Sequence, residues 1–181
     1  DPLPSFIGLL GFLIPIVAIA LSFDSINGEF NRRTMSRILA QPIYRDALLL
    51  GKFLSGLLAL AIGLVSLWLL VLGLGLLLFG VPPNGEEMLR MIGFFVATLA
   101  YGGVWLALAL LFSVAFRAPA TAALAALGVW LLFALFWTMI TPLLASMIAG
   151  PPEGVFGPRM EYLQTAQIID RLSPNTLYAE T

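Results

Sequence analysis

Four long apolar runs, almost free of charged residues, constrain this 181-residue chain most strongly. They cover about 6–23, 48–79, 91–116 and 120–149. A helix of about 20 residues crosses a bilayer core about 30 Å thick, and each run approaches or exceeds that length. Only 10% of the residues are charged, against about 25% in soluble domains, so a soluble fold would lack polar surface. We therefore predict an all-α, polytopic membrane bundle with four transmembrane helices.

We take residues 1–181 as a single transmembrane domain. Helix-breaking residues separate the apolar runs within it. Two prolines and two glycines within 80–85 end the second span. The connection 117–119 is so short that the third and fourth spans are expected to be antiparallel neighbours. Pro15 and Pro142 lie inside spans, where kinks are expected. A polar tail, expected to face outward, occupies 150–181.

The arginines and lysines predict the orientation. Positive charges concentrate in the first loop, and one more lies in the third loop, whereas acidic residues predominate on the opposite side. The positive-inside rule then places loops 24–47 and 117–119 in the cytoplasm, with the spans in a plasma (inner) membrane. The residues expected to anchor the spans at the cytoplasmic surface are Arg45, Lys52 and Arg117.

The first loop has helical periodicity over about 25–41. Three arginines within six residues exclude it from the bilayer interior, so we expect an amphipathic helix that ends at Pro42. Glu29 and Arg33 have the spacing of a helical ion pair. The residues that share one face are Ile26, Phe30, Thr34 and Ile38. Two interpretations remain open: a helix that rests on lipid and fixes topology, or a helix that docks into a cytoplasmic partner.

The same loop contains an ordered series of motifs. A Phe-Asp pair, a Gly-Glu pair, an arginine and a threonine precede an apolar turn, and Gln-Pro, arginine and Gly-Lys-Phe follow. This order resembles the first cytoplasmic loop of type-two ABC transporter permeases, exporter-type membrane subunits with six spans. The matching residues are Phe23-Asp24, Gly28-Glu29, Arg32, Thr34, Ile38-Leu39, Gln41-Pro42, Arg45 and Gly51-Lys52-Phe53. The family often has glycine before the threonine, where this chain has Arg33.

The resemblance, which extends to permeases that serve copper-site maturation of nitrous oxide reductase, implies partners and roles. Spans two to five of six would be present here, because the chain lacks an initiator methionine and a closing span. The helix at 25–41 would be the coupling helix, seated on a cytoplasmic ATP-binding cassette subunit, and a second permease subunit and membrane lipid would complete the assembly. The residues implied in ATPase coupling are Glu29, Arg32, Thr34, Ile38, Leu39 and Pro42.

The leading functional prediction is therefore a permease subunit that couples ATP hydrolysis on a separate subunit to export or force transmission. The alternative is a membrane scaffold or sensor whose basic amphipathic helix binds anionic lipid. Histidine and cysteine are absent, and no phosphate-binding loop is present, so we predict no enzymatic activity, catalytic residue, metal site or cofactor. We also predict no nucleic-acid partner.

Local patterns add packing predictions. A small residue at every fourth position of the second span either would let another helix approach closely or merely reflects the composition of membrane helices. In the tail, Ser173-Pro174 has the pattern of a helix start, with a serine cap and proline at the first helical position. The small residues are Gly51, Ser55, Ala59 and Gly63. The polar groups deep in spans, expected to bond mainly to backbone carbonyls or neighbouring helices, are Thr98, Tyr101, Thr138, Thr141 and Ser146.

Overall fold

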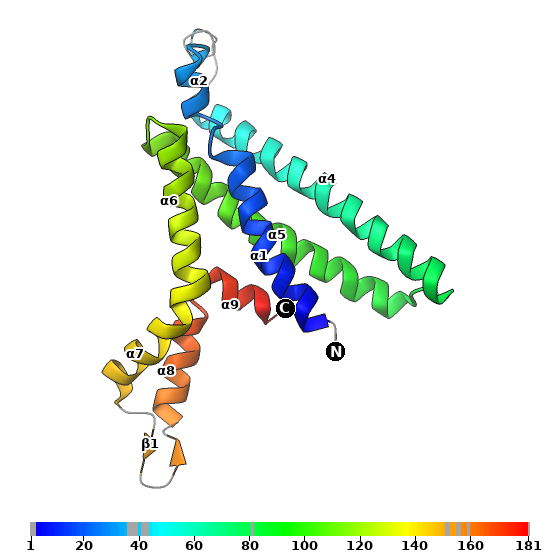
Figure 1. Cartoon of the computed structure of the whole chain (residues 1–181), viewed down its shortest axis with the longest axis vertical. Helices are drawn as coiled ribbons and strands as arrows, with labels where there is room; N and C mark the ends of the chain where they lie inside the picture. The colour runs from blue at the N-terminus through cyan, green and yellow to red at the C-terminus, as the bar shows by residue number, and fades with distance from the viewer. Residues whose placement is uncertain are drawn as a thin grey trace. The chain divides into compact units, whose positions relative to one another are not determined.

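The computed structural model of the chain describes residues 3–35, 40, 44–80, 82–150, 153–154, 157–158 and 160–180, and these are almost entirely helical (Figure 1). The first half contains α1 (Leu3–Ser22), α2 (Asn27–Asn31), α4 (Arg45–Phe79) and α5 (Gly85–Ala115). The second half contains α6 (Pro119–Leu131), the π-helix η1 (Leu132–Phe136), α7 (Trp137–Ala149), α8 (Met160–Asp170) and α9 (Pro174–Ala179). Two-residue strands β1 (Glu153–Gly154) and β2 (Gly157–Pro158) pair antiparallel.

Within the described part of the chain, four helices are long and apolar enough to cross a membrane, in agreement with the four predicted spans. They cover Gly8–Asn31, Arg45–Leu78, Gly85–Ala115 and Pro119–Ala149. The last of these contains η1, a five-residue π-helix between α6 and α7. Pro142 lies inside α7, so the helix continues through this proline.

Helix α5 begins six residues before the apolar run that predicted it, because polar residues form its first turn. Asn84 caps the helix: its side-chain oxygen accepts a hydrogen bond from the Glu87 N–H at 2.8 Å. The Glu87 carboxylate in turn accepts from the Asn84 N–H at 2.9 Å. This reciprocal capping box satisfies two donors that the helix start leaves unpaired. Arg90, one turn further, pairs with Glu86 at 2.6 Å.

Residues Leu13–Ala126 form one compact unit, and α5 contributes nine of its buried residues, more than any other helix of the unit. A Cβ atom at Gly102 would lie 2.4 Å from a methyl of Leu60 in α4 and 2.9 Å from one of Ile14 in α1. A Cβ at Gly56 would lie 2.8 Å from a Leu106 methyl. Glycine at these two positions thus lets the side chains of α1, α4 and α5 pack closely, and a larger residue would force Leu60, Ile14 or Leu106 to shift. Hydroxyls in the spans donate to carbonyls of their own spans, as predicted, at Thr98, Thr138 and Ser146.

The predicted stripe of small residues on the second span does not pack against other parts of the described chain at its two glycines. No heavy atom of the described structure outside α4 lies within 4 Å of a Cβ built at Gly51 or Gly63. The close approach uses Gly56 instead, on a different face of α4. The four-residue spacing of the small residues therefore did not predict which face of α4 meets a neighbouring helix.

The second compact unit combines Asp1–Phe12 with Leu127–Thr181. Within it α8 packs against α7, and the Thr141 hydroxyl donates to the Asp170 carboxylate at 2.8 Å. The predicted start of the tail helix is confirmed: the Ser173 hydroxyl accepts from the Asn175 N–H at 3.3 Å, and Pro174 is the first residue of α9.

Candidate functional site: the junction of α2 with α4 and α5

The helix predicted over 25–41 is not continuous, which corrects that expectation. Helix α2 covers only Asn27–Asn31, and Arg33 has a φ of 58°, in the left-handed region that favours glycine. The chain turns there, and the N–H and hydroxyl of Thr34 both donate to the Glu29 carbonyl, at 3.1 and 3.2 Å. Glu29 and Arg33 therefore lack the helical geometry that their spacing predicted.

The start of α2 is capped by a distant residue. The N–H groups of Ile26 and Asn27 donate to the hydroxyl oxygen of Ser113, near the end of α5, at 3.0 and 3.3 Å. No local side chain caps this helix. Ser113 is only 1% exposed, so this hydroxyl satisfies donors that burial would otherwise leave unpaired. Sequence reasoning missed Ser113, since 87 residues separate it from Ile26.

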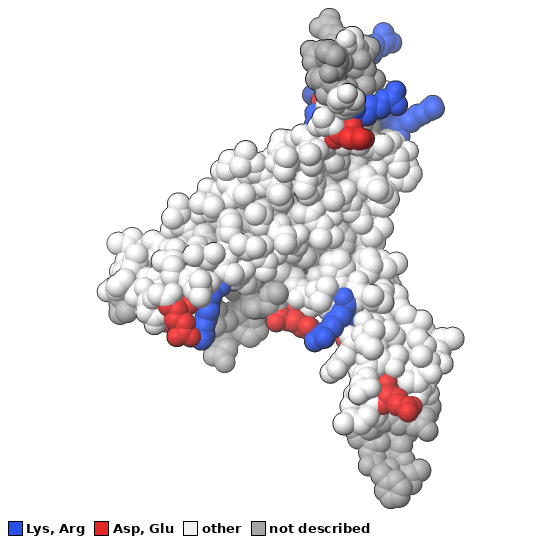
Figure 2. Space-filling model, turned by 180° about the vertical axis from the view of Figure 1, so that it is seen from behind, with Lys and Arg blue, Asp and Glu red and all other residues white. Residues whose placement is uncertain are grey.

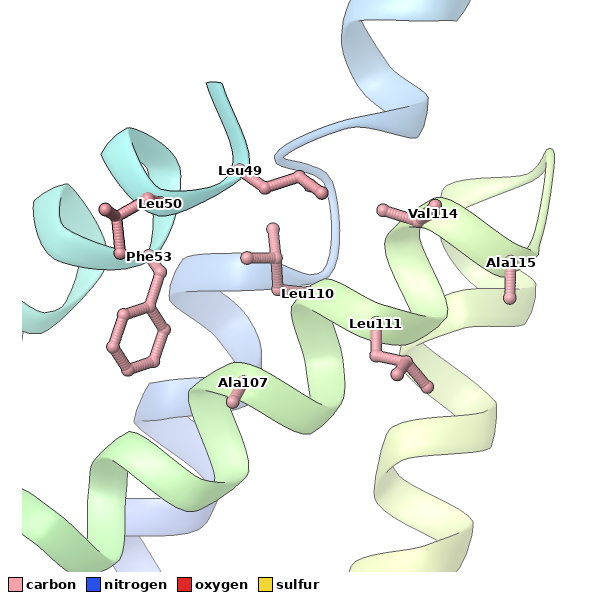
Figure 3. A pocket seen from close by; sticks show the side chains of 8 residues that line it. All are labelled: Leu49, Leu50, Phe53, Ala107, Leu110, Leu111, Val114 and Ala115. Atoms are coloured by element: carbon pink, nitrogen blue, oxygen red, sulfur yellow. The ribbon is translucent and has the colours of Figure 1, made fainter. Parts of the chain in front are cut away.

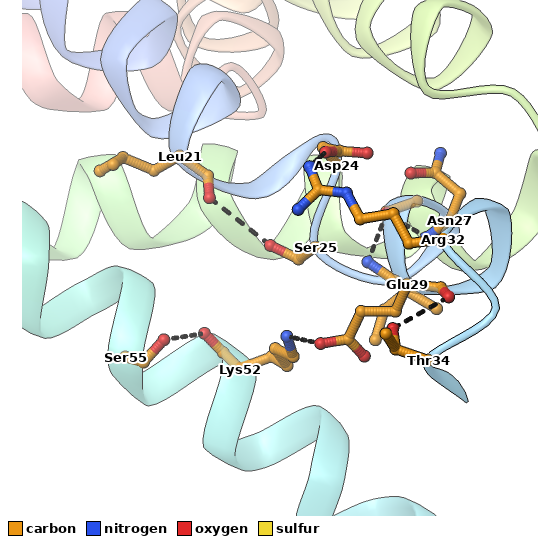
Figure 4. Close-up of polar contacts among 11 residues, drawn as sticks. Leu21, Asp24, Ser25, Asn27, Glu29, Arg32, Thr34, Lys52 and Ser55 are labelled. Carbon is orange, nitrogen blue, oxygen red and sulfur yellow. Dashed lines mark hydrogen bonds and ion pairs between the residues drawn. The ribbon is translucent and has the colours of Figure 1, made fainter. Parts of the chain in front are cut away.

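Two ion pairs hold the loop, as Figure 4 shows. Lys52, in the second turn of α4, donates to the carboxylate of Glu29, and both side chains are largely buried, at 28% and 21% exposed. The second pair joins Arg32 to Asp24 at 3.3 Å, with Arg32 75% exposed. The sequence predicted Lys52 as a membrane anchor. In the structure its ion pair with Glu29 connects α2 to α4.

Apolar side chains also pack at the junction, and the backbone at Gly28 lies close to a side chain. Ile26, Met35 and Leu110 form a buried cluster against the first turns of α4. A Cβ atom at Gly28 would meet the Asp24 carboxylate, which would then have to shift. The loop is thus joined to α4 by an ion pair, to α5 by hydrogen bonds, and to both by apolar contact.

The structure brings together some of the predicted site residues. Glu29, Arg32 and Thr34 lie in or directly after α2, whereas Ile38, Leu39 and Pro42 lie outside the described residues. Arg45 begins α4, and Arg117 follows α5 by two residues; both are exposed. Figure 2 shows lysine and arginine side chains gathered around α2 and the start of α4.

The described residues contain no group of three or more histidine, cysteine, aspartate or glutamate side chains arranged to hold a metal ion. Asp24, Asn27 and Glu29 at the junction each have a buried side-chain oxygen without a hydrogen-bond partner in the described structure. The contacts of the junction are ion pairs, hydrogen bonds and apolar packing.

Comparison with known proteins gives a family match over nearly the whole chain. The model described as "ABC-2 family transporter protein" matches residues 5–180. A probable ABC transporter permease protein NosY from Stutzerimonas stutzeri is 34% identical over 157 residues, covering 86% of this chain and 55% of that protein. The protein of the same name from Pseudomonas aeruginosa is 34% identical over 162 residues, with the same coverage of both chains. This chain thus spans about half the length of these curated relatives.

Proposed function

This chain belongs to the ABC-2 family of transporter proteins, and from that premise we propose how its first loop works. The chain is an integral membrane permease component. We propose that it couples ATP hydrolysis on a separate cytoplasmic ATP-binding cassette subunit to export or to force transmission across the membrane. In this proposal α2 and the turn after it are the coupling element that contacts the ATPase.

The observation that carries this proposal is the attachment of α2 to two spans at once. Ser113 joins its start to α5, and the Glu29–Lys52 pair joins it to α4. A force applied to α2 therefore reaches both helices without a flexible connection between them. A helix that only rested on lipid would not need buried contacts of this kind.

The exposed residues of the loop define the proposed ATPase surface. Phe30 is 58% exposed, and Arg32, two residues further along, is exposed as well. Because Glu29 is mostly buried against Lys52, we assign it to holding α2 on α4 instead of contacting the partner. The residues that complete the proposed ATPase contact are Thr34, Ile38, Leu39 and Pro42.

Orientation and assembly are part of the proposal. The basic loop would face the cytoplasm of a plasma (inner) membrane, with Arg45, Lys52 and Arg117 at the lipid surface, and the tail at 150–181 would face outward. Ser113 contacts α2 only four residues before Arg117, so the first and third loops share one end of this unit. A second permease subunit would complete the membrane part.

The test uses the full-length protein with its ATPase subunit, reconstituted in nanodiscs. Phe30→Ala with Arg32→Ala is expected to weaken co-purification of the ATPase. Asp24→Asn is the matched control, because it removes the Asp24–Arg32 pair and leaves Arg32 in place. Glu29→Ala with Arg32→Ala is expected to lower transport-linked ATPase activity without unfolding the spans.

Exchanging the charges of Glu29 and Lys52 distinguishes the attachment of α2 to α4 from the contact of α2 with the ATPase. Glu29→Lys alone should leave the ATPase bound but reduce its coupled activity, and Lys52→Glu in the same protein should restore that activity. Unchanged coupling and co-purification in all of these variants would rule out the proposed coupling element. If the ATPase does not associate and the loop binds anionic liposomes, the scaffold or sensor alternative replaces it.

A further inference from the structure

An apolar groove of about 530 Å³ lies between α4 and α5, within one compact unit (Figure 3). Eight side chains line it, and none carries a hydrogen-bonding group. They are Leu49, Leu50 and Phe53 from α4, and Ala107, Leu110, Leu111, Val114 and Ala115 from α5. Both helices are candidate membrane spans, so the groove lies in segments that contact lipid.

Charged residues lie close in sequence to the lining residues at one end of this groove. Arg45 precedes the lining residue Leu49 by one helical turn, about 6 Å along the axis. Arg117 follows the lining residue Ala115 by two positions, and both arginines are exposed. One acidic residue, Asp46, is exposed at the same end and reduces the positive charge there.

We propose that the groove binds one anionic phospholipid of the membrane, with an acyl chain between α4 and α5 and the phosphate between Arg45 and Arg117. This inference goes beyond the proposed coupling function and does not depend on it. A phospholipid has both required parts in the right order: an apolar chain that fits a lining without polar groups, and an anion at the basic end.

The two parts contribute differently to binding. A lipid chain gains little by leaving other lipid chains for an equally apolar groove, so the groove fixes position more than affinity. Each arginine near a lipid anion favours binding by about fivefold. Selectivity for an anionic headgroup over a zwitterionic one must therefore come from Arg45 and Arg117.

The first test measures lipid retention by native mass spectrometry, on full-length protein released from nanodiscs of phosphatidylcholine and phosphatidylglycerol. Arg45→Gln and Arg117→Gln are each expected to lower the ratio of retained phosphatidylglycerol to phosphatidylcholine by about fivefold. Asp46→Asn is expected to raise it. Arg90→Gln, which removes an exposed arginine at the opposite end of α5, is the control and should leave the ratio unchanged.

The second test fills the groove. Ala107→Trp places a large side chain on an exposed lining position, whereas Ala100→Trp places it two turns away on the same face of α5, outside the lining. Ala107→Trp is expected to abolish the retained phosphatidylglycerol, and Ala100→Trp to preserve it. An unchanged thermal midpoint in both variants would confirm that the fold is intact.

Two results would overturn the proposal. Equal lipid ratios in wild type, Arg45→Gln and Arg117→Gln would mean that the basic end does not select an anion. If Ala107→Trp alters the ratio of dimer to monomer and leaves lipid retention as it was, a second protein chain occupies the groove instead.

Discussion

Helices α4 and α5 are neighbours of similar length, yet the more apolar of the two, α4, is the less buried. The most apolar stretch of α4 has a mean hydropathy of 2.7 and is 11% buried; that of α5 has a mean hydropathy of 2.0 and is 44% buried. In a soluble protein the more apolar helix would be the buried one. Here lipid is the solvent, so α4 can expose its leucines while α5 makes the specific contacts.

Polar residues reinforce this difference. Thr98, Tyr101 and Ser113 of α5 are buried, and Ser113 bonds to another segment. On α4 the hydroxyls of Ser55 and Ser66 donate only to carbonyls of their own helix, at Lys52 and Ile62. The contacts that specify the fold therefore concentrate on α5, and the following substitutions test that conclusion from the largest expected effect to the smallest.

Replacing a glycine at the centre of α5 should have the largest effect. Gly102→Leu forces side-chain atoms into Leu60 and Ile14, and we expect a loss of about 3 kcal/mol in the free energy of unfolding in mixed micelles. Gly63→Leu, on the open face of α4, should change it by less than about 0.5 kcal/mol. A comparably large loss at Gly63 would mean that α4 packs against another helix in the assembled protein.

Removing one hydroxyl from each helix gives the next comparison. Ser113→Ala leaves the N–H groups of Ile26 and Asn27 without their acceptor, and we expect a cost of about 2 kcal/mol. Hydrogen exchange at these two amides should accelerate. Ser66→Ala, whose hydroxyl bonds within its own turn, should be close to neutral in the same assay. Equal effects of both substitutions would contradict the assigned cap.

The starts of the two helices also differ, since α5 begins with a capping box and Tyr44 gives α4 no side-chain cap. Asn84→Ala should cost about 1 kcal/mol in the free energy of unfolding. It should also increase hydrogen exchange in the first turn of α5 to the level seen in α4. Asn84→Asp retains a capping oxygen and should preserve protection; a loss as large as that of Asn84→Ala would argue against the cap.

The smallest effect is expected at an exposed ion pair. Arg90→Ala removes the partner of Glu86, both side chains being mostly exposed, and should cost about 0.3 kcal/mol. Added salt should reduce even that difference, because it screens exposed charges. A cost above about 1 kcal/mol would show that this end of α5 contacts something beyond the described residues.

The sequence was sufficient where local rules decide the structure. Hydropathy gave the four spans, and Ser173-Pro174 gave the start of α9, because each depends on neighbouring residues alone. The sequence did not predict contacts between residues that are far apart in the chain. Neither the Ser113 cap nor the Glu29–Lys52 pair has a local signal, since the partners lie 87 and 23 residues apart.

For the first loop, the sequence predicted some features and missed others. The periodicity of its apolar residues predicted a continuous helix, but the left-handed conformation of Arg33 ends that helix early. The motif order placed Glu29 and Arg32 in one segment correctly, yet only the structure reveals that Glu29 is turned toward Lys52 and Arg32 toward solvent. Residue type and spacing thus named the residues of the candidate site, which stays a prediction, while the direction of each side chain depended on packing.

The single hydroxyl of Ser113 has a consequence for how motion can pass along the chain. Both N–H groups at the start of α2 share this one acceptor, so a rotation of α5 that withdraws the oxygen releases both together. Loss of the Ser113 oxygen would leave both donors without this partner, and the Glu29–Lys52 pair and the apolar cluster of Ile26, Met35 and Leu110 would remain as the other contacts of the loop.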